Sequence, residues 1–192
     1  MLLYMTEGHD NMVLDKVVKE KLGLVQVYTG EGKGKTTACL GLGFRAAGDG
    51  LKVLMLQFLK PQNNTGEQIS AELLPNFTFR SLGLDHFGGD RVSRATDVKL
   101  AEKAFKEAKE EIYSNDYDMV ILDEINVAMD WKLLDPEMVV AMLRARPEHV
   151  EIVLSGRGAP GTIMDYADLV TEMRKVKHPF DKGVHARRGV EF

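Results

Sequence analysis

The sequence has little cysteine and no long apolar run. Among its 192 residues, a single cysteine, Cys39, excludes an intramolecular disulfide framework and a cysteine-based zinc site. No stretch approaches the roughly 18 uninterrupted apolar residues of a membrane span. The apolar start at residues 1–5 is too short for a signal-peptide core. We therefore expect a cytoplasmic protein with no membrane partner.

The composition is otherwise ordinary for a globular chain. Hydrophobic residues make up 44% of it and charged residues 28%, which argues against general disorder. The net charge of −4 disfavours nucleic acid as a partner, because phosphate contacts need a basic face. The segment 171–190 differs, since it holds six Lys or Arg residues against Glu172 and Asp181. Such a run is either a solvated face or a surface that faces an anion.

The length suits one domain with a short appendage. We expect residues 1–22 to be an N-terminal arm, in which Val13, Val17 and Val18 recur at helical spacing. Residues 23–192 would then form the folded domain.

Within this domain, apolar runs alternate with helical patterns. Strands are expected at residues 24–28, 53–59, 77–82, 119–122, 150–154 and 169–173. Helices are expected at residues 35–47, between 65 and 74, at 96–114 and at 136–146. This alternation is typical of an α/β fold with a mostly parallel sheet and helices on both faces. Ligands of such sheets bind beyond the carboxyl ends of the strands, so residues that follow a strand are site candidates.

A glycine-rich loop follows the first strand and opens the first helix. Its backbone N–H groups and the helix N-terminus suit phosphate oxygens. Lys35 is placed to reach the phosphates, and the Thr36 hydroxyl to ligate Mg²⁺. The loop is a variant, because Thr29 stands where the P-loop pattern G-x-x-x-x-G-K-[ST] has its first glycine. It predicts a nucleoside triphosphate ligand and a single-domain P-loop NTPase-like (RecA-like) fold. The loop residues are Thr29, Gly30, Glu31, Gly32, Lys33, Gly34, Lys35, Thr36 and Thr37.

Two acids, Asp123 and Glu124, follow the apolar run 119–122. After a P-loop, an acid in this place helps to hold Mg²⁺, which prefers one or two carboxylates with phosphate oxygens and water. Successive residues of an extended strand point in opposite directions, so the sequence leaves open which acid faces the metal. Glu124 is also suited to orienting a water molecule, which would make the protein an ATPase.

Three further charged residues are weaker candidates. Arg157 follows the strand at 150–154, where its guanidinium either meets a phosphate or is simply exposed in a turn. Glu67 either reaches the same cleft or is an ordinary acid at a helix start. Arg45 lies nearly three helical turns after Lys35, so the spacing alone favours a structural ion pair.

Aromatic residues are few, and no protein nucleophile stands out. Trp131 and Phe87 are each either buried or placed to stack on a planar ligand. The five histidines show no metal-ligand spacing, and no Ser/His/Asp or Cys/His arrangement is evident. Covalent catalysis by a protein side chain is therefore not indicated.

Several separated segments together resemble the P-loop cob(I)alamin (corrinoid) adenosyltransferase family. The similarity runs from about residue 23 to the C-terminus, and this family shows the same departure at the first loop glycine. The run VKHPFDKGV at residues 176–184 is the most specific part, because a generic P-loop ATPase would not carry it. The other matching segments are residues 28–37, 45–48, 53–60, 66–67, 120–124, 145–147, 155–158 and 167–173.

The resemblance implies a reaction. Cobalt(I) of a reduced corrinoid attacks the 5′ carbon of ATP, triphosphate leaves, and a cobalt–carbon bond forms. The chemistry is then the cofactor's, and the protein supplies orientation and electrostatics. Lys35, Thr36 and Mg²⁺ would hold the leaving triphosphate, and Asp123 or Glu124 would serve the metal. The resemblance thus makes Lys35, Thr36 and Glu124 the expected catalytic residues.

The same resemblance implies further contacts and partners. Besides the phosphate loop, it places Arg45, Glu67, Phe87 and Arg157 at the bound ATP and corrinoid. It implies a homodimer, an N-terminal arm that acts as a lid near the corrinoid, and a reductase, such as a flavoprotein, that supplies Co(I).

The sequence departs from the family in one loop. Family members often carry a Phe-x-Trp pair that packs on the corrin, whereas the matching stretch here is Phe87-Gly88-Gly89. Two other functions therefore stay open. One is a P-loop ATPase or small-molecule kinase, and the other is a carrier that binds ATP and corrinoid without turnover.

Overall fold

Six parallel strands form one sheet in this computed structural model, which describes residues 21–61, 65–83 and 94–191. The strand order is β3-β2-β4-β5-β1-β6, so β5 lies between the first strand and the strand that ends in the acid pair. All five pairings are parallel. The strands are β1 (Val25–Thr29), β2 (Val53–Gln57), β3 (Phe77–Ser81), β4 (Met119–Asp123), β5 (Glu151–Ser155) and β6 (Leu169–Glu172).

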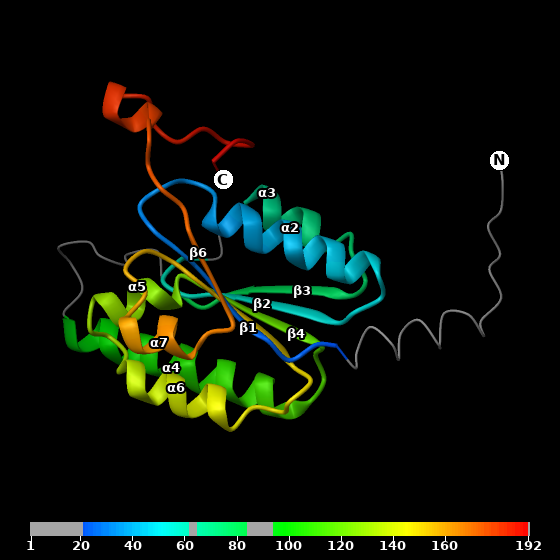
Figure 1. The fold of residues 1–192 in the computed structure, drawn as a ribbon. Helices are drawn as coiled ribbons and strands as arrows, with labels where there is room; N and C mark the ends of the chain where they lie inside the picture. Colours follow the sequence, from blue (N-terminus) through cyan, green and yellow to red (C-terminus); the bar gives the residue numbers. More distant parts are fainter. Residues whose placement is uncertain (1–20, 62–64, 84–93, 192) are drawn as a thin grey trace, which may run out of the picture.

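Helices cover both faces of the sheet (Figure 1). One face carries α2 (Lys35–Gly48) and α3 (Gly66–Ala71). The other carries α4 (Arg94–Ser114), α5 (Ile125–Asp130), α6 (Pro136–Arg144) and α7 (Gly161–Tyr166). A separate cluster of buried apolar side chains fills the interface between the sheet and the helices on each face. The central strands β2, β4 and β5 are therefore buried along their whole length. This is the RecA-like α/β class that the sequence predicts.

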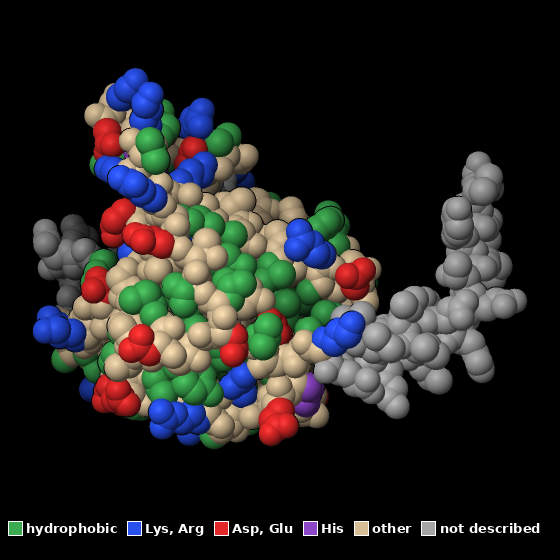
Figure 2. Space-filling model, viewed as in Figure 1, with side chains coloured by type: hydrophobic (Ala, Val, Ile, Leu, Met, Phe, Trp, Pro, Cys, Tyr) green, Lys and Arg blue, Asp and Glu red, His purple; other side chains and the backbone are tan. Residues whose placement is uncertain are grey.

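The chain continues beyond β6 as an exposed C-terminal segment. It includes a short 3-10 helix (Pro179–Lys182) and then turns back, so that its end lies beside the start of α2 (Figure 1). Lys and Arg side chains gather on this projecting segment (Figure 2). None of the helices in the described part of the chain has the length and apolar character that crossing a bilayer requires.

The predicted strands and long helices are all present, with ends that shift by one or two residues in most cases. The pattern at 53–59 ends earlier, because Leu59 has a left-handed φ of 62° that no strand residue adopts. The sequence patterns missed α5, α7 and the 3-10 helix, which have six, six and four residues. Such short elements show less than two turns of periodicity. Residues 1–20 of the expected arm lie outside the described residues.

Close packing of α2 on the sheet depends on Gly43. A Cβ atom at this position would lie 2.4 Å from Phe77 Cε2 and 3.1 Å from Ile121 Cδ1. At Gly41, on the same helix, a Cβ atom would meet nothing within 4 Å.

We predict that Gly43→Ala lowers the free energy of unfolding by about 1–3 kcal/mol, because the added methyl overfills the interface. The matched variant Gly41→Ala should raise it by up to about 1 kcal/mol through helix propensity. Urea denaturation of both variants measures the two effects. Equal stability of the two variants would contradict the packing described for Gly43.

Candidate active site

The glycine-rich loop joins β1 to α2 at the carboxyl edge of the sheet. Gly30 and Gly34 adopt positive φ angles of 94° and 121° that glycine favours. The Lys35 ammonium turns back into the loop and donates to Gly30 O at 2.6 Å and to Gly32 O at 2.8 Å. Burial lowers the pKa of Lys35, and the nearby positive charge of Arg157 lowers it further. Phosphate oxygens that enter the loop can therefore replace Gly30 O and Gly32 O as the hydrogen-bond acceptors of Lys35.

Thr29 replaces the usual first glycine and has a contact that glycine could not make. Its side-chain Oγ1 accepts a hydrogen bond from Ala159 N at 3.2 Å. The residue is nearly fully buried. The hydroxyl therefore ties the start of the loop to the turn that follows β5.

The segment after β6 passes directly over the loop. Gly32 N donates to Met173 O at 2.6 Å, and Cβ atoms at Gly30 or Gly32 would each lie 2.6 Å from this same oxygen. Further along, Lys33 Nζ lies 2.9 Å from Glu191 Oε1 and also donates to Val190 O. The loop glycines are thus required by the close approach of the C-terminal segment as well as by backbone conformation.

Asp123 is fully buried beneath the loop. One carboxylate oxygen, Oδ1, accepts from Thr36 Oγ1 at 3.0 Å and from the Ser155 hydroxyl. The other, Oδ2, accepts from Gln57 Nε2 at 2.8 Å and lies 3.8 Å from Lys60 Nζ. Asp123 therefore fixes the Thr36 hydroxyl, which a phosphate-bound metal ion would need.

Glu124 faces the open cavity instead. Its left-handed φ of 64° ends the strand and starts α5. Its carboxylate lies 3.5 Å from Lys60 Nζ. Burial raises the pKa of Glu124 and the neighbouring Asp123 raises it further, whereas Lys60 and Lys35 lower it. The two acids thus differ in position: Asp123 accepts a hydrogen bond from the loop threonine Thr36, and Glu124 lines the cavity.

Two cavities flank the start of α2. The first, of about 670 Å³, is lined by Glu31, Gly32, Lys33, Gly34, Lys35, Thr36, Thr37, Leu59, Lys60, Glu124, Val127, Asp130, Trp131, Arg157, His178 and Glu191. The second, of about 690 Å³, is lined by residues from α3, the end of β2 and the C-terminal segment. The two cavities share Thr36, Thr37, Lys60 and Glu191.

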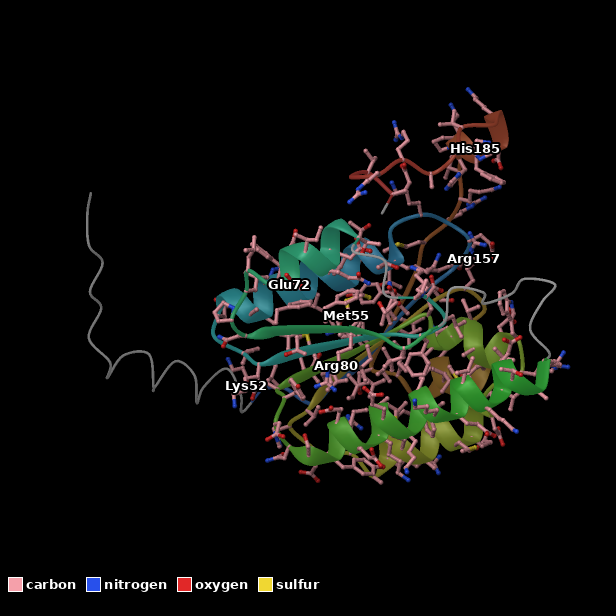
Figure 3. The ribbon with its side chains drawn as sticks, turned by 180° about the vertical axis from the view of Figure 1, so that it is seen from behind. Lys52, Met55, Glu72, Arg80, Arg157 and His185 are labelled. Carbon is pink, nitrogen blue, oxygen red and sulfur yellow. The ribbon has the colours of Figure 1, made fainter. Side chains whose placement is uncertain are left out.

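The weaker sequence candidates separate clearly in the structure. Arg157 lies at the same end of the sheet as the phosphate loop, lines the first cavity and pairs with Glu31 at 3.6 Å (Figure 3). Glu67 lines the second cavity. Arg45 is exposed in the last turn of α2 and lines neither cavity, and it forms no ion pair within the described residues. Phe87 lies outside the described residues.

Sequence reasoning missed several residues at the site. Lys60 carried a signal, since it directly follows the apolar run 53–59 at the carboxyl edge. His178 belongs to the specific C-terminal run but had no spacing that would place it. Glu191 is 158 residues from its partner Lys33, and no local pattern reports such a contact.

The fold and the site define a P-loop nucleotide-binding protein. Residues 21–192 match the model of the ATP:corrinoid adenosyltransferase family BtuR/CobO/CobP, and the chain belongs to this family. It is 40% identical to the corrinoid adenosyltransferase of Sinorhizobium sp, covering 94% of this chain and 89% of the relative. Identity to the corrinoid adenosyltransferases of Escherichia coli K12 and Salmonella typhimurium LT2 is 36%, covering 91% of this chain and 88% of each relative.

We predict that Glu124→Gln stabilises the ligand-free protein at pH 8. The folded state raises the pKa of Glu124 above its ordinary value of 4.5, so the charged form is disfavoured on folding. The wild type therefore gains stability as pH falls through the folded-state pKa toward 4.5, and the variant lacks this gain. Melting temperatures from pH 8 down to pH 5 should show a difference that shrinks with acidification.

The control is Glu148→Gln, which changes an exposed acid outside both cavities. A lower melting temperature for Glu124→Gln than for the wild type at pH 8 would show that the carboxylate's pairing with Lys60 outweighs its burial.

Proposed function

We propose that the protein transfers the 5′-deoxyadenosyl group of ATP to the Co(I) centre of a reduced corrinoid and releases triphosphate. The observation that carries this proposal is the phosphate loop set against the Asp123–Glu124 pair, in a chain of the ATP:corrinoid adenosyltransferase family. The carbon–oxygen bond at C5′ breaks and a cobalt–carbon bond forms, with both electrons of the new bond coming from Co(I). The reaction needs no protein nucleophile.

The loop would bind and stabilise the leaving triphosphate. Lys35 gives up its bonds to Gly30 O and Gly32 O and donates to phosphate oxygens instead. Arg157, exposed at the same cavity, adds a guanidinium suited to a second phosphate. Because these cations are in place before reaction, they stabilise the charge that the triphosphate gains in the transition state.

The donors around Thr36 fit a magnesium ion. Mg²⁺ is commonly held by one or two carboxylates, with phosphate oxygens and water completing its shell. The Thr36 hydroxyl and the Glu124 carboxylate line one cavity and would hold the ion. Asp123 would keep Thr36 in place through its hydrogen bond. When bound, Mg²⁺ neutralises charge on the triphosphate.

Two substrates need two binding regions. The two cavities meet at Thr36, Thr37 and Lys60, so ligands in both would approach each other at the start of α2. Holding C5′ in line with cobalt in this way would contribute by proximity. The corrinoid is bound and turned over as a substrate.

The remaining parts of the proposal concern assembly. The protein would act in the cytoplasm as a homodimer and receive its Co(I) corrinoid with the help of a reductase, such as a flavoprotein. The side chains of β6 support self-association, because this edge strand is exposed throughout and carries Leu169 and Val170. The N-terminal arm would serve as a lid near the corrinoid.

We predict that the protein, mixed anaerobically with Mg-ATP and chemically reduced cob(I)alamin, forms light-sensitive adenosylcobalamin and one triphosphate per turnover. Lys35→Ala should lower kcat by about 10²–10³-fold, because it removes a preorganised charge from the leaving group. The visible spectrum follows the cobalt–carbon bond, and phosphate analysis identifies the released product.

Lys52→Ala is the matched control, since Lys52 is exposed at the opposite end of the sheet (Figure 3). Formation of ADP and phosphate without a cobalt–carbon bond would replace the proposal with an ATPase or kinase. Binding of both ligands without turnover would identify a carrier.

A further inference from the structure

One face of α5 lines the first cavity from end to end. Glu124, Val127 and Trp131 are spaced by three and four residues, so their side chains share this face. Glu124 follows Asp123, which accepts a hydrogen bond from Thr36 of the phosphate loop, and lines the cavity together with the loop. Trp131, about two helical turns later, lies at the other end of α5.

The lining of the cavity combines charged and apolar groups. The loop from Gly32 to Lys35 and the Arg157 guanidinium are suited to anions. The cavity is also lined by four acids, Glu31, Glu124, Asp130 and Glu191. Among the described residues that line the cavity, the apolar side chains are those of Leu59, Val127 and Trp131. A cavity that holds both cationic groups and an aromatic, apolar group matches a nucleotide, which has a charged and a flat part.

The backbone around Trp131 is fixed, although half of the residue's surface is exposed. Trp131 N donates to Val127 O at 2.9 Å, and Arg94 Nη2 donates to Trp131 O at 3.3 Å. The residue is 50% exposed, which is high for the largest apolar side chain in the protein. A large, half-exposed ring on a fixed backbone is a suitable platform for a planar ligand.

Backbone strain accompanies this arrangement. Positive φ angles occur at Leu59 (62°) and Glu124 (64°), which line the cavity, and at Lys132 (57°), next to Trp131. Leucine rarely adopts this conformation, and such strained residues cluster at ligand sites. Two residues that line the cavity and the neighbour of a third thus hold an uncommon backbone conformation.

We propose that the Trp131 indole stacks on the purine base of the bound nucleotide and so determines the affinity for ATP. This inference rests on the proposed function in that it takes ATP as the ligand. Base and triphosphate belong to one molecule, and Trp131 lines the same cavity as the phosphate loop. The stacking assigns the ring to ATP and not to the corrin.

The sequence offers a direct probe, because Trp131 is its single tryptophan. Mg-ATP should quench or shift the intrinsic fluorescence in a saturable manner. Inorganic tripolyphosphate should compete with ATP for the loop without reproducing the spectral change, because it has no base. A tripolyphosphate signal equal to that of ATP would overturn the assignment.

Trp131→Ala should raise the Kd for Mg-ATP, measured by calorimetry, by about tenfold or more, the loss expected for one base-stacking contact. The Kd for tripolyphosphate should stay unchanged, and Trp131→Phe should restore most of the ATP affinity. Phe44→Ala is the matched control, since Phe44 is 64% exposed on α2 and lines neither cavity at the loop. An unchanged Kd for ATP in Trp131→Ala would refute the stacking.

The adenosyl-transfer assay separates this inference from the proposed function. Transfer that persists while Trp131→Ala leaves the Kd for ATP unchanged would refute the stacking alone. ATP-specific quenching without transfer would refute the proposed function and leave the nucleotide platform in place. An increase in the KM for corrinoid, with unchanged ATP binding, would place the indole against the corrin and overturn the assignment.

Discussion

Asp123 is a carboxylate without solvent exposure, and its side chain accepts hydrogen bonds from the starts or ends of three other elements. Thr36 donates from α2, Gln57 from β2 and Ser155 from β5. Leaving a buried carboxylate without such partners costs several kcal/mol, so the donors and the elements that carry them are held in place. The backbone adds to this, since Phe58 N donates to Asp123 O. Asp123, at the end of β4, therefore holds α2 and the neighbouring strands β2 and β5 in place relative to one another.

The acid pair shows what a local pattern can and cannot predict. An apolar run followed by two acids was sufficient to predict a strand that ends in two acids at the carboxyl edge of the sheet. Their division of roles was not predictable, because it depends on one residue leaving the extended conformation. Glu124 turns to a φ of 64°, which sends its side chain to the cavity and begins a helix too short to show periodicity.

Contacts over long sequence separations set the limit of prediction in the rest of the site. The loop from Thr29 to Thr37 was predictable because glycine, lysine and threonine requirements lie within nine neighbouring positions. The hydrogen bond between Ala159 N and Thr29 Oγ1 joins residues 130 apart, and Gly32 meets Met173 across a similar separation. Local sequence patterns do not predict these long-range contacts. Only the strand order, with β5 and β6 on either side of β1, brings them together.

The cations of the site have anionic or carbonyl partners within the protein. Lys33 pairs with Glu191, Arg157 with Glu31, and Lys60 with Glu124. The pair of Arg157 with Glu31 involves two exposed side chains, and in the pair of Lys33 with Glu191 the lysine is exposed. Exposed pairs contribute little, typically about 0–1 kcal/mol. A triphosphate with several charges can therefore displace the acids at small cost, and Lys35 exchanges carbonyl oxygens for phosphate oxygens. The binding energy then depends on how much more strongly these cations interact with phosphate oxygens than with the protein's own carboxylates and carbonyl oxygens. This difference favours a highly charged triphosphate over a single phosphate.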